Sequence, residues 1–229
     1  MNTQRLVHLV ERAQCLLLDF DGPICSVFAN YPAPNVADQL RQLLVDQGVA
    51  LPPQVREESD PMEILRYAGK MNRPDVVRKV EDALRDAELI AARSATPTPY
   101  AREVIVTAHQ NGRRIAIVSN NSAEAIRAHL TARRLNSYIG AIVGRAYGDP
   151  DLMKPSPLPV LIALKELNAG PKECAMVGDS VSDIDSARAA GVHAIGYANK
   201  PGKREKLAHA YATIDSMLDL VALLSNDRP

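Results

Sequence analysis

Two aspartates, Asp19 and Asp21, stand two positions apart directly after a short apolar run and are followed by Gly22. At the end of a strand, this spacing can turn one carboxylate toward a ligand, while a tight bend at the glycine places the other differently. One aspartate can then attack phosphorus to form an acyl phosphate, and its neighbour, if held protonated, can give a proton to the leaving oxygen. The pair therefore leaves room for two catalytic roles in phosphoryl chemistry.

Three further segments place polar residues beyond apolar runs. Ser119 and Asn120 follow the second run, Lys154 lies in the loop beyond the third, and Asp179 and Asp183 follow the fourth. Because carboxylates alone repel phosphate, a fixed positive charge on Lys154 and a magnesium ligand such as Asp179 complete the set. Ser119 offers a hydroxyl, and backbone amides near it can cradle phosphate oxygens. Each pattern alone is common in turns and caps, but their ordered occurrence favours a functional site.

Short runs rich in Val, Ile and Leu alternate with helical patterns, as in a parallel sheet that helices cover on both faces. In such open sheets, ligands bind beyond the carboxyl ends of the strands, which is where the polar residues stand. We therefore predict an α/β fold with a doubly wound, Rossmann-like parallel sheet. The predicted strands are 15–19, 114–118, 141–143, 175–177, 194–197 and 212–214, with crossover helices over 123–134 and 158–167.

The interval between the first two predicted strands is too long for one crossover or for a structureless loop. It contains three helical patterns, one capped by Asn35, one capped by Asp60 with Glu63 as capping-box acid, and one over 75–93. We expect an all-helical cap domain inserted after the first strand. The predicted boundaries are a cap over 23–95 and a core over 1–22 and 96–229.

Composition excludes several classes of protein. In the 229-residue chain, 27 Lys and Arg balance 27 Asp and Glu, so no positive field draws the protein to nucleic acid. No apolar run approaches the roughly 20 residues that span a bilayer, and no signal peptide is recognisable. We expect a cytoplasmic protein without nucleic-acid or membrane partners. Cys15, Cys25 and Cys174 fit neither a disulfide framework nor a zinc site, and we interpret them as packing residues.

These four polar segments closely resemble the four motifs of the haloacid dehalogenase superfamily, and the resemblance covers the whole chain, including the helical insertion. Residues 178–191 are similar to phosphoglycolate phosphatase-like members that have a helical cap. The resemblance implies Asp19 as the nucleophile, and Asp21 as general acid and then as base for the hydrolytic water. Pro23 departs from the threonine or valine-like residue of many relatives, and its missing N–H puts the local geometry of the entry into the cap in question, but not the nucleophile.

The resemblance also implies a magnesium ion as cofactor. Its expected ligands are Asp19, the backbone carbonyl of Asp21 and Asp179, while Asp183 orients metal-bound water or the lysine. The phosphate group is expected to contact Ser119, Asn120 and Lys154.

Our leading hypothesis is a magnesium-dependent phosphatase that hydrolyses a small phosphorylated metabolite through an aspartyl phosphate. A sugar-phosphate mutase of the same superfamily and a non-catalytic protein that binds a phosphorylated ligand remain alternatives. Dehalogenation is disfavoured because dehalogenases lack an aspartate at the position of Asp21. Arg66, Tyr67 and Lys70 in the insertion are weaker candidates for substrate contacts. The sequence leaves the oligomeric state and the substrate open.

Overall fold

A computed structural model describes residues 2–225 of the chain. Its core contains a six-stranded sheet in the order β5-β4-β1-β6-β7-β8, in which all neighbouring strands pair in parallel. The predicted α/β class and all six predicted strands are therefore confirmed. The strands are β1 (Cys15–Leu18), β4 (Arg114–Val118), β5 (Ala141–Val143), β6 (Cys174–Gly178), β7 (His193–Tyr197) and β8 (Ala212–Ile214).

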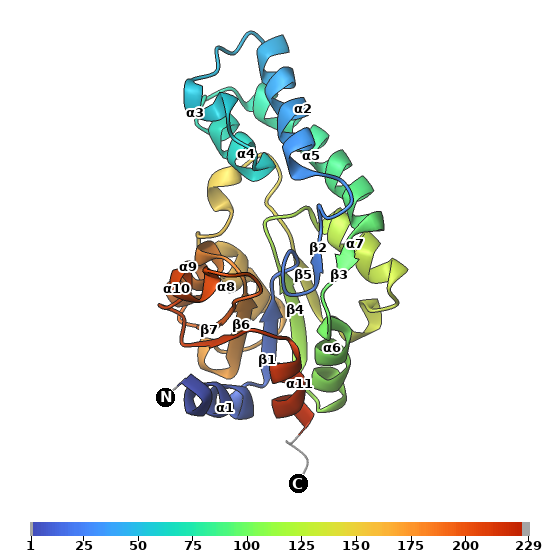
Figure 1. Ribbon diagram of the computed structural model, residues 1–229, viewed down its shortest axis with the longest axis vertical. Coiled ribbons are helices and arrows are strands. Elements are labelled where there is room, and N and C mark those ends of the chain that lie inside the picture. The colour runs from blue at the N-terminus through green and yellow to red at the C-terminus, as the bar shows by residue number, and fades with distance from the viewer. Residues whose placement is uncertain (1, 226–229) are drawn as a thin grey trace.

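Helices cover both faces of this sheet (Figure 1). Along β1, Leu16 and Leu18 pack into the core on one face, while Cys15 and Leu17 pack into the core on the other. Burial on both faces explains why β1 is apolar throughout rather than alternating. The helices of this part are α1 (Asn2–Arg12), α6 (Ala101–Gln110), α7 (Ala123–Ala132), α8 (Leu158–Glu166), α9 (Val181–Ala189), α10 (Lys203–Lys206) and α11 (Leu218–Ser225), with short 3₁₀ turns at Asn136–Tyr138, Pro150–Leu152 and Pro171–Glu173.

The insertion after β1 is helical, as predicted, and stands above the carboxyl ends of the strands (Figure 1). It has its own apolar core, to which Leu40, Leu65 and Leu84 contribute from three different helices. Two short antiparallel strands join it to the sheet domain. The exact domain boundaries remain a prediction. The helices are α2 (Ala33–Asp46), α3 (Pro53–Arg56), α4 (Pro61–Gly69) and α5 (Pro74–Ser94), and the joining strands are β2 (Cys25–Ser26) and β3 (Thr96–Pro97).

Two of the three predicted capping details were wrong. Asn35 lies inside α2, which begins two residues earlier because Pro34 fits the first turn of a helix. Asp60 does cap α4, accepting a bond from the Met62 N–H at 2.8 Å. Glu63 forms no capping box with it, since its carboxylate pairs with Arg66 at 3.1 Å.

The three cysteines are buried and free, which agrees with their interpretation as packing residues. Within residues 2–225, the structure has no helix with the length and apolar character needed to cross a lipid bilayer.

Candidate active site

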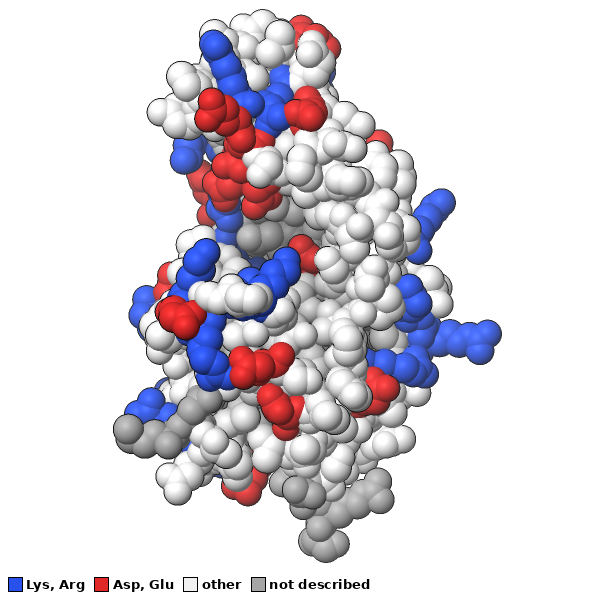
Figure 2. Space-filling model, viewed as in Figure 1, with Lys and Arg blue, Asp and Glu red and all other residues white. Residues whose placement is uncertain are grey.

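The carboxyl ends of the central strands and the base of the cap enclose a cleft of about 630 Å³. Figure 2 shows this hollow between the cap and the core. Because β1 lies between β4 and β6, Asp19 at the end of β1 is flanked by the polar residues that follow β4 and β6. Six of the seven predicted site residues line the cleft, namely Asp19, Asp21, Ser119, Asn120, Lys154 and Asp179, and the seventh, Asp183, lies directly behind Lys154.

Asp19 stands at the end of β1 and is 7% exposed. Its N–H donates to the Val177 carbonyl at 2.9 Å, which extends the pairing with β6 by one residue. Its Oδ1 accepts bonds from the Phe20 N–H at 2.7 Å and from Lys154 Nζ at 2.9 Å. Burial raises the pKa of Asp19 to about 8, with the charge of Asp183 adding to the rise and that of Lys154 opposing it.

The ammonium group of Lys154 is fully buried and has three acceptors. They are the Val118 carbonyl at 2.9 Å, Asp19 Oδ1 at 2.9 Å and Asp183 Oδ1 at 2.5 Å. Burial disfavours the charged form of this lysine, but the carboxylates of Asp183 and Asp19 outweigh that effect and raise its pKa. Lys154 is therefore a fixed, permanently charged cation with all three of its N–H bonds directed.

Asp183 is held at the start of α9, where its Oδ1 contacts the lysine. Its Oδ2 accepts bonds from the Ser180 N–H at 3.0 Å and the Ser180 hydroxyl at 2.6 Å, forming a capping box. A Cβ at position 178 would lie 2.3 Å from the Cβ of Asp183, so only Gly178 permits this approach. Both oxygens of Asp183 are thus engaged, which supports the predicted orienting role.

Asp21 lies in the turn after β1, where its Oδ1 accepts the Val27 N–H at 2.9 Å. Burial raises the pKa of Asp21 to about 6, so this carboxyl keeps a proton to higher pH than an exposed aspartate. The turn closes without any donor at Pro23, because the Gly22 N–H bonds to the Cys25 carbonyl at 2.7 Å. The missing N–H of the proline therefore leaves the turn intact.

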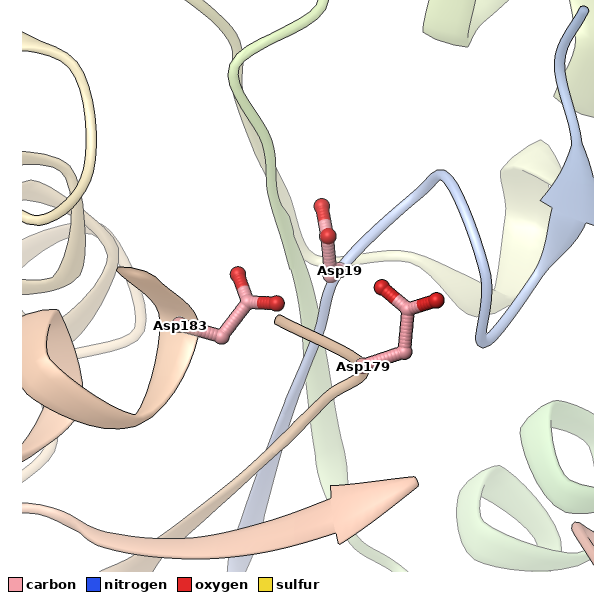
Figure 3. Close-up of side chains that lie close together, drawn as sticks. All are labelled: Asp19, Asp179 and Asp183. Carbon is pink, nitrogen blue, oxygen red and sulfur yellow. The ribbon is translucent and has the colours of Figure 1, made fainter. Parts of the chain in front are cut away.

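Oxygen atoms of Asp19, Asp179 and Asp183 lie within 4.8 Å of one another, and Figure 3 shows the three carboxylates gathered around one point. Hard carboxylate oxygens at this spacing suit Mg²⁺. Position 22 has a φ of 106°, and a Cβ there would lie 2.4 Å from the Asp179 Cγ, so Gly22 makes space for that carboxylate. These residues fit a divalent cation. The side chain of Asp21 is not part of the cluster, and its backbone carbonyl remains a predicted ligand.

The second polar segment is more constrained than its sequence indicates. The Ser119 hydroxyl donates to Asn121 Oδ1 at 3.2 Å and is almost fully buried. The side-chain amide of Asn120 donates to the Lys154 carbonyl at 3.2 Å and accepts the Lys154 N–H at 2.8 Å. Asn120 thus fixes the backbone that carries the lysine, and phosphate binding by Asn120 and Ser119 remains a prediction.

A buried ionic cluster behind this segment was not anticipated. Arg145, in the loop after β5, pairs with Glu81 at 2.7 Å and with Glu88 at 2.8 Å, both from α5 of the cap. Its guanidinium also donates to the Asn120 carbonyl at 2.6 Å, and Glu88 accepts the Ser122 N–H at 2.9 Å. The cluster therefore ties the longest cap helix to the loop that follows β4.

The weaker candidates in the cap are not in the cleft wall. Among the described residues that line the cleft, none is Arg66, Tyr67 or Lys70. Arg66 instead donates to the Lys154 carbonyl and pairs with Glu63. Two lysines missed by sequence reasoning belong to the cleft region: Lys203 pairs with Asp179, and Lys200 lines the cleft.

Proteins similar in sequence to this chain include phosphatases. The chain is 27% identical over 225 residues to a phosphoglycolate phosphatase of Pectobacterium atrosepticum, covering 92% of each chain. It is also 27% identical over 186 residues to a phosphoglycolate phosphatase of Aquifex aeolicus, covering 77% of this chain and 80% of the relative.

Solved structures share the fold. A putative phosphoglycolate phosphatase from Lactobacillus plantarum matches with a TM-score of 0.67 at 20% identity, covering 92% of this chain and 99% of the other. CbbY from Rhodobacter sphaeroides, crystallised with phosphate, matches with a TM-score of 0.66 at 19% identity, covering 93% of this chain and 99% of the other.

The family model described as haloacid dehalogenase-like hydrolase matches residues 13–191, which span all four polar segments and the helical cap. The chain therefore belongs to the haloacid dehalogenase-like hydrolases, as the resemblance of its motifs predicts.

Proposed function

We propose that this hydrolase is a magnesium-dependent phosphatase that cleaves a small-molecule phosphate monoester through an aspartyl phosphate on Asp19. The observation that carries the proposal is the buried contact at 2.9 Å between Lys154 Nζ and Asp19 Oδ1, at the floor of a cleft that also contains Asp21. This contact supports the proposal, because the predicted nucleophile lies beside a buried cation in a cleft that also holds a carboxyl of raised pKa.

The residues support a two-step reaction. In the first step, a carboxylate oxygen of Asp19 bonds to phosphorus while the ester P–O bond breaks, and Asp21 gives its proton to the leaving oxygen. In the second, Asp21 takes a proton from water as that water attacks phosphorus, which releases phosphate and restores Asp19. Lys154 holds the nucleophile in place and offsets the charge of the phosphoryl oxygens.

The charges of the site explain the need for a metal. Asp19, Asp21, Asp179 and Asp183 lie with three lysines around a cleft that must accept a phosphate bearing roughly two negative charges. Bound Mg²⁺ would neutralise part of this charge and favour the ionised form of Asp19.

We therefore expect phosphate release from phosphomonoesters to require Mg²⁺ and to stop on chelation with EDTA. The measurement is orthophosphate release with 4-nitrophenyl phosphate and a panel of phosphorylated metabolites, with product analysis for isomeric sugar phosphates. Equal rates with Mg²⁺ and with EDTA would contradict the proposed metal dependence. An isomeric product without phosphate release would identify a mutase instead.

The raised pKa of Asp21 predicts a pH dependence that differs between leaving groups. Below about pH 6 the carboxyl is protonated and can act as acid, and this form is lost as pH rises. Alkoxide leaving groups need the proton, whereas nitrophenolate leaves without it. The ratio of kcat/KM for an alkyl phosphate to that for 4-nitrophenyl phosphate should fall as pH rises through about 6. In Asp21→Asn the ratio should be low at every pH, and a wild-type ratio independent of pH would argue against Asp21 as the acid.

A further inference from the structure

The cap contributes no cation to the cleft wall. Among the described lining residues, those from the cap come from the starts of α2 and α4 and the segment before α2, and Asp60 is the only charged one. The half-buried side chains of Phe28 and Met62 give this wall an apolar part. The lysines of the lining, Lys154 and Lys200, both belong to the core.

Lys154, the buried lysine of the lining, has no N–H left for an anionic group at the cap. Its ammonium is committed to three acceptors, the Val118 carbonyl and the carboxylates of Asp19 and Asp183. Lys200 follows β7 and lines the cleft from the core. On the cap, Arg66 is already bonded to Glu63 and to the backbone of Lys154.

The start of α4, on the cap side of the cleft, offers no free N–H donor among the residues that the structure describes. Helix N-termini commonly bind anions through unpaired N–H groups. In α4, Pro61 has no N–H, the Met62 N–H bonds to the Asp60 carboxylate, and the Glu63 N–H bonds to the Asp60 carbonyl at 3.1 Å. The first turn of α2 likewise contains Pro34. The carboxylate of Asp60 offsets the roughly half positive charge at the start of α4, so this helix end offers an anion little attraction.

We propose that the group esterified to the phosphate carries no negative charge of its own and has a hydroxyl that donates to Asp60. This inference rests on the proposed phosphatase function and narrows its substrate class. The carbon skeleton of such a group packs on Phe28 and Met62. A leaving group with a carboxylate or a second phosphate would face Asp60 without a cationic partner on the cap. Phosphoglycolate is therefore a poor substrate of this chain. Figure 2 shows acidic and basic side chains side by side on the cap above the hollow.

A matched pair of substrates tests the proposal. Ethylene glycol monophosphate and phosphoglycolate differ only in the exchange of a hydroxymethyl group for a carboxylate. We expect kcat/KM of the wild-type protein with Mg²⁺ to be about tenfold or more higher for the uncharged member. Equal values, or a preference for phosphoglycolate, would overturn the inference and leave the phosphatase function standing.

Variants of the residues that line the cleft from the cap test whether charge causes the preference for the uncharged substrate. Asp60→Asn should reduce the difference in kcat/KM between ethylene glycol monophosphate and phosphoglycolate, because asparagine keeps the helix-capping acceptor and removes the charge. Ser59→Lys, at an exposed lining position, should favour phosphoglycolate. Asp38→Asn removes an exposed acid of α2 that is not among the lining residues and serves as control. If Asp60→Asn leaves the ratio of kcat/KM for the two substrates unchanged, the role of Asp60 is overturned.

Hydrolysis of 4-nitrophenyl phosphate measures the phosphatase chemistry independently of the cap. If the wild-type protein does not hydrolyse it, the phosphatase function is overturned as well.

Discussion

Asp19→Asn should lower kcat by on the order of 10⁴-fold or more while leaving the fold intact. An amide oxygen is a far weaker nucleophile than a carboxylate, and no other carboxylate of the cleft stands at the end of β1. The asparagine Oδ1 can still accept the Phe20 N–H, so the local backbone keeps its partner. The measurement is steady-state phosphate release, together with acid quenching after mixing with substrate labelled in the phosphoryl group.

Covalent labelling distinguishes a nucleophile from a residue that only binds metal. The wild-type protein should retain label after the quench, and Asp19→Asn should retain none. Asp185→Asn is a matched control on α9, because Asp185 pairs with the exposed Arg188 at 2.9 Å and should affect neither rate nor label. Label in Asp19→Asn, or a kcat within tenfold of the wild type, would exclude Asp19 as the nucleophile.

Arg145→Met should lower the free energy of unfolding by about 3–5 kcal/mol, because it leaves two buried carboxylates without their cation. The side chains of Arg145 and Glu88 are fully buried, and that of Glu81 is 3% exposed. The variant also loses the bond to the Asn120 carbonyl, so the loop beyond β4 is expected to loosen and kcat/KM to fall. Urea unfolding followed by circular dichroism measures the first effect. A midpoint equal to that of the wild type would show that the cluster contributes nothing to stability.

The two carboxylates of this cluster should differ in importance. Glu88 bonds to Arg145, the Asn121 amide and the Ser122 N–H, whereas Glu81 Oε2 is buried and has no partner among the described residues. Glu88→Gln is therefore expected to cost more stability than Glu81→Gln, and the reverse order would contradict the geometry.

The protonation of Glu81 adds a dependence on pH. Burial raises its pKa in the folded state, so the folded protein binds this proton more tightly than the unfolded chain. The resulting stabilisation is present at low pH and is lost as pH rises through the folded pKa. As pH rises from below 4.5, the ordinary pKa of glutamate, through the folded pKa of Glu81, the Glu81→Gln variant should therefore lose less stability than the wild type. An equal loss in both proteins would argue against a raised pKa.

The sequence alone determined the sheet and the edge at which the site lies. Strands and the polar residues that follow them are local patterns, and parallel strands bring their carboxyl ends to one edge whatever their order. Asp19, Ser119 and Asp179 could thus be placed together without coordinates. The role of Asp60 as the N-cap residue of α4 could also be predicted from the sequence, because a capping side chain bonds only within the first turn of its own helix.

Only the tertiary structure decided which partners these residues have. Glu81 and Glu88 lie seven positions apart on the buried face of α5, a pattern visible in the sequence, but their partner Arg145 is more than fifty residues away. The use of the Asn120 amide to hold Lys154 depends likewise on how two distant loops meet. The charge of the cap wall depends on which helix ends face the cleft. Local composition and periodicity specify elements, but contacts between elements follow from their packing in space, which determines the partners of each charge.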